Sequence, residues 1–557
     1  MTLAVIIATG RAEGPDPFPA AAVPVPSADG GVSLLTRLVR RLERLGVAEH
    51  RVITRPALAP PLRKDGHDPV ECEDTAADLR EIARLARRAR TPVVLLPGDL
   101  VISDEQLTRL VLDAADRPAT AVTVRRPAGR GRPVRVDGSG RVVSAGSGFH
   151  RVSAPTADFP GPLCVGEQRT VQAAEIAESI AVLLEVPGAL PAVPPAPPAP
   201  PTALPAISPS ALTTWTTPQT APPPPPEPEP EAEAETAPES DDGPADEHDA
   251  LELLLVGLVR AGMPVTADPA APELVCRRVS GVEAAQEALE AAERADEDGV
   301  RLRAAIKRDD GWFATYAVSS WSPLLVRAAA WLGVEPNAVT WASGGLAALA
   351  AFCFAGGDRS GMVAGAVLFY LAFVLDCVDG QLARFTRRYS PFGAWLDAMF
   401  DRLKEYAVYA GLAAGASAAA WDGGPHAGNV WMLATAALAL QTVRHMVDFS
   451  YADRPRPAAP DAPPIPLTVA GDQRPERPRT PAAPAGTAER LSRATTAVPA
   501  LHWAKKIVVL PIGERFAVIC LTAALGTARL TFAVLLVWGW IAGCYTLTGR
   551  VMRALHG

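Results

Sequence analysis

Residues 376–401 read DCVDGQLARFTRRYSPFGAWLDAMFD, and their four aspartates lie in and beside two long apolar segments. Carboxylates are costly at bilayer depth, so an acid in such a segment indicates a functional site. Asp376 and Asp379 are three residues apart, and Asp397 and Asp401 are four apart. These spacings place each pair on one face of a helix.

A helix boundary separates the two pairs. Ser390 and Pro391 form an N-cap and first-turn pair, so a second helix is expected to begin there. The two helices then form an antiparallel hairpin that brings the carboxylates to one membrane level. Such a cluster suits hard divalent cations, and two ions would suit in-line phosphoryl transfer.

At these residues the sequence resembles the CDP-alcohol phosphatidyltransferase family, whose signature is DxxDGxxAR, eight residues, then GxxxDxxxD. Every position of the signature matches. The matching residues are Asp376, Asp379, Gly380, Ala383, Arg384, Gly393, Asp397 and Asp401. The resemblance implies an enzyme that moves a phosphatidyl or other phospho-alcohol group from a CDP-alcohol to an acceptor alcohol and releases CMP.

The resemblance also implies a role for each matching residue. Asp376, Asp379 and Asp397 would bind two metal ions, Mg²⁺ or Mn²⁺. Asp401 would contact one ion and act as general base on the acceptor hydroxyl. The nucleotide would lie beside the remaining signature positions, namely Gly380, Ala383, Arg384 and Gly393. A homodimer is the expected assembly.

Six apolar stretches are long enough to cross a bilayer, which predicts an all-α bundle with six transmembrane helices over residues 336–557. They lie near 338–357, 361–382, 395–418, 428–448, 507–527 and 530–550. The arginine-rich loops fall on the same side as both termini, so we expect a multi-pass protein of the cell membrane with cytoplasmic N- and C-termini. MTLAVIIATG at the start has no basic leader and is not expected to be a signal peptide.

Several residues near the predicted spans could complete a substrate site. The segment PNAVT resembles the family's first transmembrane helix, so Asn337 and Thr340 are expected to border the nucleotide, although both residue types also suit a helix start. Arg444 and Arg515 could bind the phosphate of an acceptor, or could instead anchor to anionic lipid heads. The insert 453–499 is rich in proline and arginine and is predicted to be a disordered cytoplasmic loop.

Strands alternate with helices in residues 1–186, which predicts an α/β sandwich of the Rossmann type. The segment LLPGDLVIS, with Asp99 at a strand end, resembles the metal-binding strand of nucleotidyltransferases that activate sugar or alcohol phosphates. That family opens with a glycine-rich loop and a downstream lysine, whereas Gly10 and Gly14 here are followed by no lysine before Lys64. The departure leaves open whether this domain is catalytic.

The rest of the soluble half divides by composition. Residues 187–249 are rich in proline and glutamate and predict a disordered linker. Residues 250–310 resume ordered patterning, either completing the N-terminal fold or forming a separate subdomain. Residues 311–335 predict an amphipathic helix in the membrane interface, with lipids as partners. This layout resembles bifunctional proteins that make and use CDP-inositol, which favours a polyol or inositol phosphate as the acceptor.

Net charge and the position of the acids restrict the alternatives. A formal charge of −8 argues against a nucleic-acid partner. A non-catalytic membrane scaffold with a nucleotide-binding soluble domain is the second hypothesis, and the intact signature argues against it. A divalent-cation transporter is the third, but all four acids lie near one membrane face instead of along a path.

Overall fold

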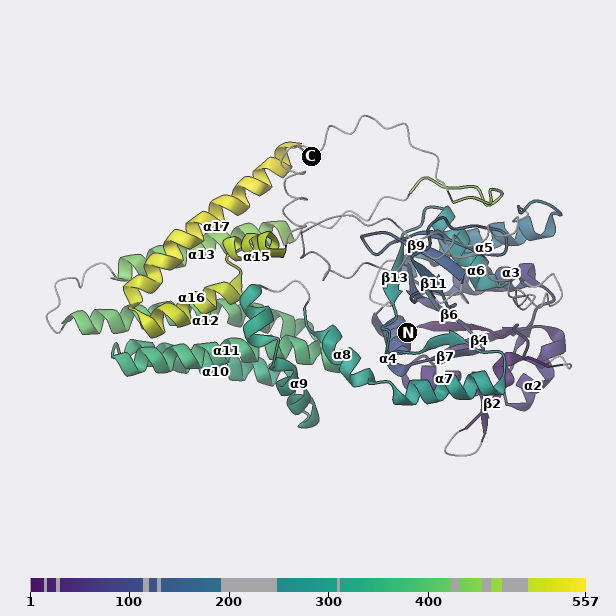
Figure 1. The fold of residues 1–557 in the computed structure, drawn as a ribbon, viewed down its shortest axis with the longest axis horizontal. Coiled ribbons are helices and arrows are strands. Elements are labelled where there is room, and N and C mark those ends of the chain that lie inside the picture. The colour runs from purple at the N-terminus through teal and green to yellow at the C-terminus, as the bar shows by residue number, and fades with distance from the viewer. Residues whose placement is uncertain are drawn as a thin grey trace, which may run out of the picture. The chain divides into compact units, whose positions relative to one another are not determined.

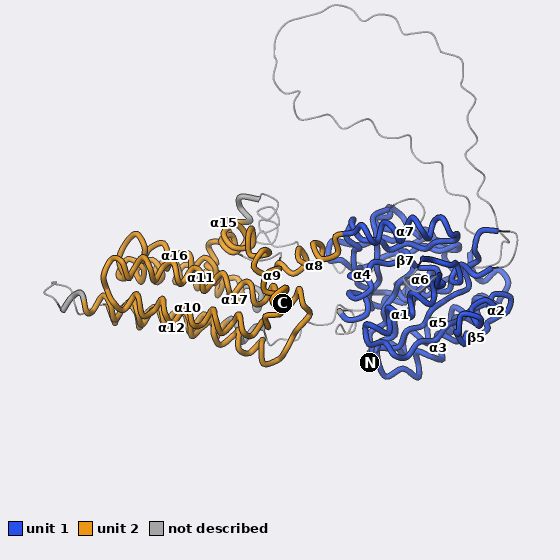
Figure 2. Tube along the Cα trace, turned by 90° about the horizontal axis from the view of Figure 1, so that it is seen from below, with its two compact units in different colours: residues 1–295, 460–475 blue, residues 296–459, 476–557 orange. Residues whose placement is uncertain are grey.

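The computed structural model describes residues 2–14, 18–26, 31–113, 120–127, 132–191, 248–307, 311–421, 430–452, 462–472 and 499–556. The chain forms two compact units (Figure 2). Unit 1 comprises Met1–Ala295 and Pro460–Pro475, and unit 2 comprises Asp296–Ala459 and Glu476–Gly557. Most of the predicted linker, residues 192–247, lies outside the described residues.

Unit 1 is built on a seven-stranded sheet with the order β13-β8-β12-β6-β1-β4-β5 (Figure 1). Its strands are β1 (Leu3–Ile7), β4 (Glu49–Thr54), β5 (Val70–Glu71), β6 (Val93–Pro97), β8 (Thr120–Val124), β12 (Leu163–Val165) and β13 (Val265–Pro269). β1 pairs in parallel with β4 and β6, while β12 runs antiparallel to β6 and β8. The predicted α/β class of the N-terminal half is confirmed.

The central strand β1 has apolar side chains on both faces, as a strand covered by helices on both sides requires. Leu3, Val5 and Ile7 pack in one core cluster, with residues of α3, α5 and α6. Ala4 and Ile6 pack in another, with residues of α1. The helices of this unit are α1 (Leu34–Arg44), α2 (Ala59–Lys64), α3 (Thr75–Arg88), α4 (Asp104–Thr108), α5 (Thr170–Glu185), α6 (Ala250–Arg260) and α7 (Val282–Arg294).

The segment 250–310 divides between the two units, with residues up to Ala295 in unit 1 and residues from Asp296 in unit 2. β13 adds to the edge of the main sheet by pairing in parallel with β8. β14 (Cys276–Arg278) pairs with β7 (Leu100–Ile102) in a separate two-stranded sheet. The remaining strands are β2 (Pro24–Val25), β3 (Val32–Ser33), β9 (Arg132–Val136), β10 (Val142–Ala145) and β11 (Ala157–Phe159).

Part of the insert 453–499 is ordered, which corrects the prediction of disorder for residues 462–472. This segment belongs to unit 1, and its carbonyls are held by Arg260, which is only 3% exposed. The guanidinium donates to the carbonyls of Pro466 (2.8 Å), Val469 (2.6 Å) and Gly471 (2.8 Å). A buried cation that needs acceptors therefore orders a segment without apolar periodicity.

Unit 2 is helical (Figures 1 and 2). Its helices are α8 (Glu297–Ala305), α9 (Ser322–Trp331), α10 (Pro336–Ala355), α11 (Arg359–Thr386), α12 (Pro391–Trp421), α13 (Val430–Ala452), α15 (Pro499–Val509), α16 (Ile512–Leu525) and α17 (Ala528–His556). α10 packs along both α11 and α12. The helical class predicted for this part is confirmed.

Small residues let α10 and α12 approach closely. A Cβ on Gly411 would lie 2.3 Å from the carbonyl oxygen of Ala351, and one on Gly415 would lie 2.0 Å from that of Phe354. Both distances are well inside van der Waals contact, so a larger residue at either glycine would force the helices apart. These contacts lie toward the C-terminal ends of both helices, and the contact of Gly393 with Asn337 lies near their starts.

Three described helices are long and apolar enough to cross a membrane, namely α10, α11 and the Ala528–Val551 part of α17. A fourth span results if Trp503–Val509 and Ile512–Leu525, bent by 74°, are taken together. The chain is thus a membrane protein, but its six-helix count is not confirmed. α9 occupies the predicted interfacial region and exposes Leu324 and Trp331 (68% and 85%), as a helix lying in lipid would.

Candidate active site

The signature aspartates converge from α11 and α12. α11 carries Asp376 and Asp379, and α12 begins at Pro391, where the Ser390 hydroxyl accepts a hydrogen bond from the Gly393 amide (2.8 Å). This is the predicted N-cap. One carboxylate oxygen from each of Asp376, Asp379 and Asp397 lies within 4.8 Å of the others. The predicted convergence of these three carboxylates is present in the structure.

These three carboxylates fit a divalent cation. All of their ligand atoms are carboxylate oxygens, which are the donors that Mg²⁺ and Mn²⁺ prefer. Asp401, which was expected to contact an ion as well, is not in this group. Its Oδ1 is buried without a hydrogen-bond partner, and the Nζ of Lys404 lies 3.6 Å from it.

The start of α10 borders the carboxylate cluster through Thr340, while the contact of Asn337 and Thr340 with a nucleotide stays a prediction. The Thr340 hydroxyl donates to Asp379 Oδ2 (2.6 Å) and thereby fixes the orientation of this carboxylate. A Cβ on Gly393 would lie 2.6 Å from Asn337 Oδ1. A larger residue than glycine would therefore displace the Asn337 side chain where α12 passes α10.

The remaining nucleotide candidates lie on α11 beyond the carboxylates. A Cβ on Gly380 would lie 3.4 Å from a terminal nitrogen of Arg384, so that guanidinium covers the glycine. Arg384 Nε also donates to the carbonyl of Ala305, the last residue of α8. Ala383 is half-buried. Their contact with a nucleotide stays a prediction.

Lys404 is a member of the site that the sequence reasoning did not identify. Its side chain is 1% exposed and its ammonium contacts Asp376, with Asp401 Oδ1 3.6 Å away. It also donates to the Ser343 hydroxyl of α10 (3.2 Å). The i,i+3 spacing of Asp401 and Lys404 was a visible signal, but the contact with Asp376 depends on the packing of three helices.

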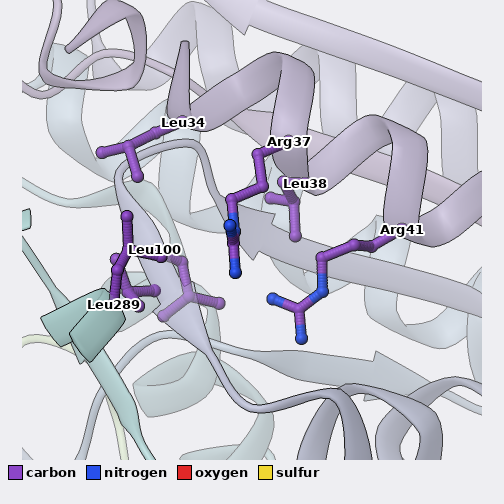
Figure 3. Close-up of a pocket in the computed structure, with 7 residues that line it drawn as sticks. Leu34, Arg37, Leu38, Arg41, Leu100 and Leu289 are labelled. Atoms are coloured by element: carbon purple, nitrogen blue, oxygen red, sulfur yellow. The ribbon is translucent and has the colours of Figure 1, made fainter. Parts of the chain in front are cut away.

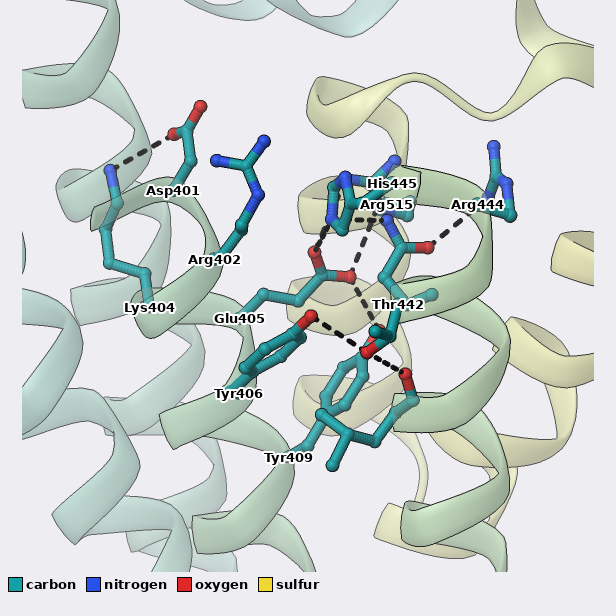
Figure 4. A network of polar contacts seen from close by, with 12 residues as sticks. Asp401, Arg402, Lys404, Glu405, Tyr406, Tyr409, Thr442, Arg444, His445 and Arg515 are labelled. Carbon is teal, nitrogen blue, oxygen red and sulfur yellow. Dashed lines mark hydrogen bonds and ion pairs between the residues drawn. The ribbon is translucent and has the colours of Figure 1, made fainter. Parts of the chain in front are cut away.

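The next residue, Glu405, centres a second polar network on another face of α12 (Figure 4). Arg515 binds both carboxylate oxygens of Glu405, through Nε at 3.2 Å and Nη2 at 3.4 Å. The Tyr409 hydroxyl donates to Glu405 Oε1 (2.7 Å), and His445 Nε2 lies 3.9 Å from Oε2. Because Glu405 is fully buried, this network neutralises a charge inside the bundle.

The two predicted acceptor-phosphate residues are thus engaged within the protein. Arg515 is paired with Glu405, and Arg444 donates to the carbonyls of Val509 (2.8 Å) and Leu510 (3.3 Å). Arg515 Nη1 also donates to the carbonyl of Leu510 (3.2 Å). Both arginines therefore stabilise the turn between α15 and α16, and a phosphate contact by either stays a prediction.

In unit 1, Asp99 is bound by an arginine. Arg278 Nε lies 2.9 and 3.1 Å from the two oxygens of Asp99, and its Nη1 binds Asp249. Burial alone would lower the pKa of Arg278, but the carboxylates of Asp249 and Asp99 raise it above its ordinary value. A Cβ on Gly10 would lie 3.0 Å from Asp99. A metal ion at Asp99 would therefore have to compete with the guanidinium of Arg278.

A small hollow in unit 1 lies apart from these carboxylates (Figure 3). It is lined mainly by apolar side chains of α1, β7 and α7, together with Arg37 and Arg41. Arg41 donates to the carbonyl of Ile102 (2.5 Å) and pairs with Asp104. Because Arg41 is engaged in this way, it connects α1 to the start of α4 and is not directed at a ligand.

Comparisons with known proteins agree with the signature. Residues 334–469 match the family model of the CDP-alcohol phosphatidyltransferases. The archaetidylinositol phosphate synthase of Aeropyrum pernix is 40% identical over 80 residues, which are 14% of this chain and 39% of the relative. That of Pyrococcus horikoshii is 37% identical over 91 residues, 16% of this chain and 46% of the relative. The chain therefore spans less than half the length of these curated relatives.

Solved structures of similar shape include the inositol-1-phosphate CTP transferase from T. maritima, with 13% identity and a TM-score of 0.32, covering 52% of this chain and 96% of that one. Another is a mannose-1-phosphate geranyltransferase from Thermus thermophilus, with 16% identity and a TM-score of 0.23, covering 34% and 68%. At such low TM-scores the likeness carries no argument about what this chain binds or does.

Proposed function

We propose that the chain is an integral membrane transferase that moves a phospho-alcohol group from a CDP-alcohol to an acceptor alcohol, because residues 334–469 match the family model of the CDP-alcohol phosphatidyltransferases. The observation that carries this proposal is the convergence of Asp376, Asp379 and Asp397 within 4.8 Å. Three carboxylates that converge on membrane helices need cations to balance their charge. Phosphoryl transfer also uses metal cations.

Asp376, Asp379 and Asp397 would hold the metal, with Mg²⁺ or Mn²⁺ as the expected ion and two as the expected number. Bound ions supply charge stabilisation at the phosphoryl oxygens of the donor. Thr340 keeps one carboxylate oriented through its 2.6 Å hydrogen bond to Asp379. Since nothing has to reorganise at the moment of reaction, such a preset orientation favours turnover.

Asp401 is proposed as the general base. The acceptor hydroxyl loses its proton to this carboxylate while its oxygen forms a bond to the β-phosphorus of the CDP-alcohol. The bond between that phosphorus and the oxygen bridging to CMP breaks, and CMP leaves with the electron pair. The position of Asp401 one helical turn after Asp397 lets it face the same space.

The acceptor is proposed to be a polyol phosphate of the inositol phosphate type. Two relatives are named archaetidylinositol phosphate synthases, and this name supports such an acceptor. The proposed topology has both termini and the site on the cytoplasmic side, where a CDP-alcohol and a water-soluble acceptor are accessible. Homodimerisation and lipid contacts through α9 complete the proposal.

The substrate proposal is tested by identifying the product. Detergent-purified full chain is incubated with Mg²⁺, inositol phosphate and either CDP-diacylglycerol or CDP-inositol, and the products are analysed by mass spectrometry. A product that joins the donor's phospho-alcohol group to inositol phosphate supports the proposal. Product with glycerol phosphate or inositol but none with inositol phosphate would refute the acceptor class and leave the transferase activity standing.

A further inference from the structure

We propose that Lys404 is a positioning residue of the transferase site, which holds the carboxylates of Asp376 and Asp401 from inside the helix bundle. The inference deepens the proposed function and rests on it. Lys404 lies one turn further along α12 than Asp401, and Figure 4 shows the two side chains pointing toward one another. It belongs to no position of the family signature, so the motif assigns it no role.

The ammonium group of Lys404 has as many acceptor residues around it as it has N–H donors. An ammonium has three donors. The acceptors around Nζ are Asp376, which it contacts directly, Ser343 Oγ at 3.2 Å and Asp401 Oδ1 at 3.6 Å. Ser343 donates its own proton to the carbonyl of Ala372 (2.8 Å), so its oxygen is fixed as an acceptor toward Lys404. Asp376 and Ser343 are therefore hydrogen-bonded to the ammonium, while Asp401 Oδ1 faces it as an ion-pair partner.

The charge of Lys404 has its counter-ions in the site. Its ion pairs in the described part of the chain are those with Asp376 and Asp401. The adjacent acid, Glu405, is already paired with Arg515. α12 thus carries two separate charge arrangements, one that neutralises Glu405 and one that couples Lys404 to two signature aspartates.

A purely structural role would not require a cation at this place. Burying an ammonium at 1% exposure costs several kcal/mol unless its partners compensate, whereas an apolar residue of similar length would pack without that penalty. The buried Oδ1 of Asp401 has no hydrogen bond, so the ammonium 3.6 Å away is the charge that compensates it. Lys404 thereby holds Asp401, the proposed base, and Asp376, a proposed ligand, at a fixed separation.

The test uses the full chain in detergent with two variants at this position. Lys404→Met keeps the length and removes the charge, and Lys404→Arg keeps a charge. Arg359→Met, which removes a cation bonded to the carbonyl of Gly526 at the other end of α11, serves as the matched control. For each protein, the thermal unfolding midpoint is measured in chelator and in saturating Mn²⁺, and kcat and KM are measured from CMP release.

Lys404→Met should widen the gap between the Mn²⁺ and chelator midpoints by several degrees, because without the ammonium only the metal offsets the repulsion of the aspartates. Its kcat should fall about 100-fold with little change in the KM of the CDP donor. Lys404→Arg should recover part of both effects, and the control should show neither.

Two results would overturn the positioning role. Equal losses in both midpoints would mean that Lys404 only packs, and an unchanged kcat in Lys404→Met would mean that the aspartates do not depend on it. The midpoints need no turnover, so the two proposals are separable. A wild-type protein that is stabilised by Mn²⁺ but releases no CMP from any donor would overturn the proposed function, while a widened gap in Lys404→Met would still support the role of Lys404.

Discussion

Arg260 offers a strong test of how the soluble unit is assembled. Its guanidinium is buried under residues 462–472, which come from the insert between α13 and α15. We predict that Arg260→Met loosens this segment without unfolding the sheet, because methionine fills a similar volume and removes only the donors. Other hydrogen bonds to the segment would remain, among them those from the Ser153 amide to Asp472 (3.0 Å) and from the Arg151 amide to the carbonyl of Ala470 (2.9 Å).

The magnitude follows from the hydrogen bonds that are lost. Arg260 makes good hydrogen bonds to three carbonyls, of Pro466, Val469 and Gly471, at 2.6 to 2.8 Å. Each is worth about 1.5 kcal/mol or more because the donor is charged. Because the three hydrogen bonds share one guanidinium, their contributions do not add fully, and we take about 3 kcal/mol for the set. Since about 1.4 kcal/mol is a factor of ten, local opening should become about 100-fold more frequent.

Hydrogen exchange followed by mass spectrometry measures this opening directly. In the variant, peptides covering residues 462–472 should exchange about 100-fold faster in full chain kept in detergent, while peptides of β1 and β6 keep their protection. Arg294→Met is the control, since Arg294 is exposed and pairs with Glu290 within α7. Unchanged exchange of the segment in Arg260→Met would refute the reasoning that the buried guanidinium holds it.

The remaining predictions concern the membrane site and the acid stability of unit 1. Thr340→Val removes the donor to Asp379 (2.6 Å) and should lower kcat for CMP release about tenfold or more; an equal kcat would exclude the orienting role. Gly393→Ala places a Cβ 2.6 Å from Asn337 Oδ1 and should weaken CDP-alcohol binding, measured by calorimetry; unaltered affinity would contradict it. Burial lowers the pKa of His150 to about 4 from 6.5, so the unfolded chain binds more protons in that window. His150 alone should therefore lower the free energy of unfolding of unit 1 by about 3 kcal/mol as the pH drops from 6.5 to 4. Burial raises the pKa of Glu252 to about 7, which acts with the opposite sign, so the His150 contribution is measured as the difference between the thermal midpoints of the wild-type chain and His150→Gln; a difference that stays constant with pH would contradict it.

Much of the site was predictable from local spacing. The N-cap at Ser390 and the start of α12 at Pro391 depend on neighbours within one helical turn, and both are found where the sequence placed them. Asp376, Asp379 and Asp397 converge as predicted, whereas Asp401 lies outside their group. Lys404 was not predictable in the same way. Its contacts with Asp376 and Ser343 exist because α10 packs along both α11 and α12, and the close approach of the helices is visible only in three dimensions.

The predicted roles of Arg515 and Asp99 could not include their ion-pair partners, because those partners lie far away in the sequence. Arg515 lies 110 residues from Glu405, and Arg278 lies 179 residues from Asp99, so neither partner could be inferred from spacing. The alternating pattern of the soluble half did predict its strands and helices, because burial on both faces leaves a clear apolar signal in β1 and β6. For residues 462–472 the prediction from composition was wrong. Proline and polar residues suggested disorder, whereas hydrogen bonds from the buried Arg260 hold the segment in place.

The central claim, that the aspartates of α11 and α12 form a metal-dependent transferase site, is tested most directly by CMP release. Purified full chain, its Asp401→Asn variant and a chelator-treated sample are each given a CDP-alcohol and a panel of acceptor alcohols. The account predicts CMP release by the wild-type chain with Mg²⁺, and none above background from the variant or in excess chelator. CMP release that persists in Asp401→Asn, or in excess chelator, would contradict it.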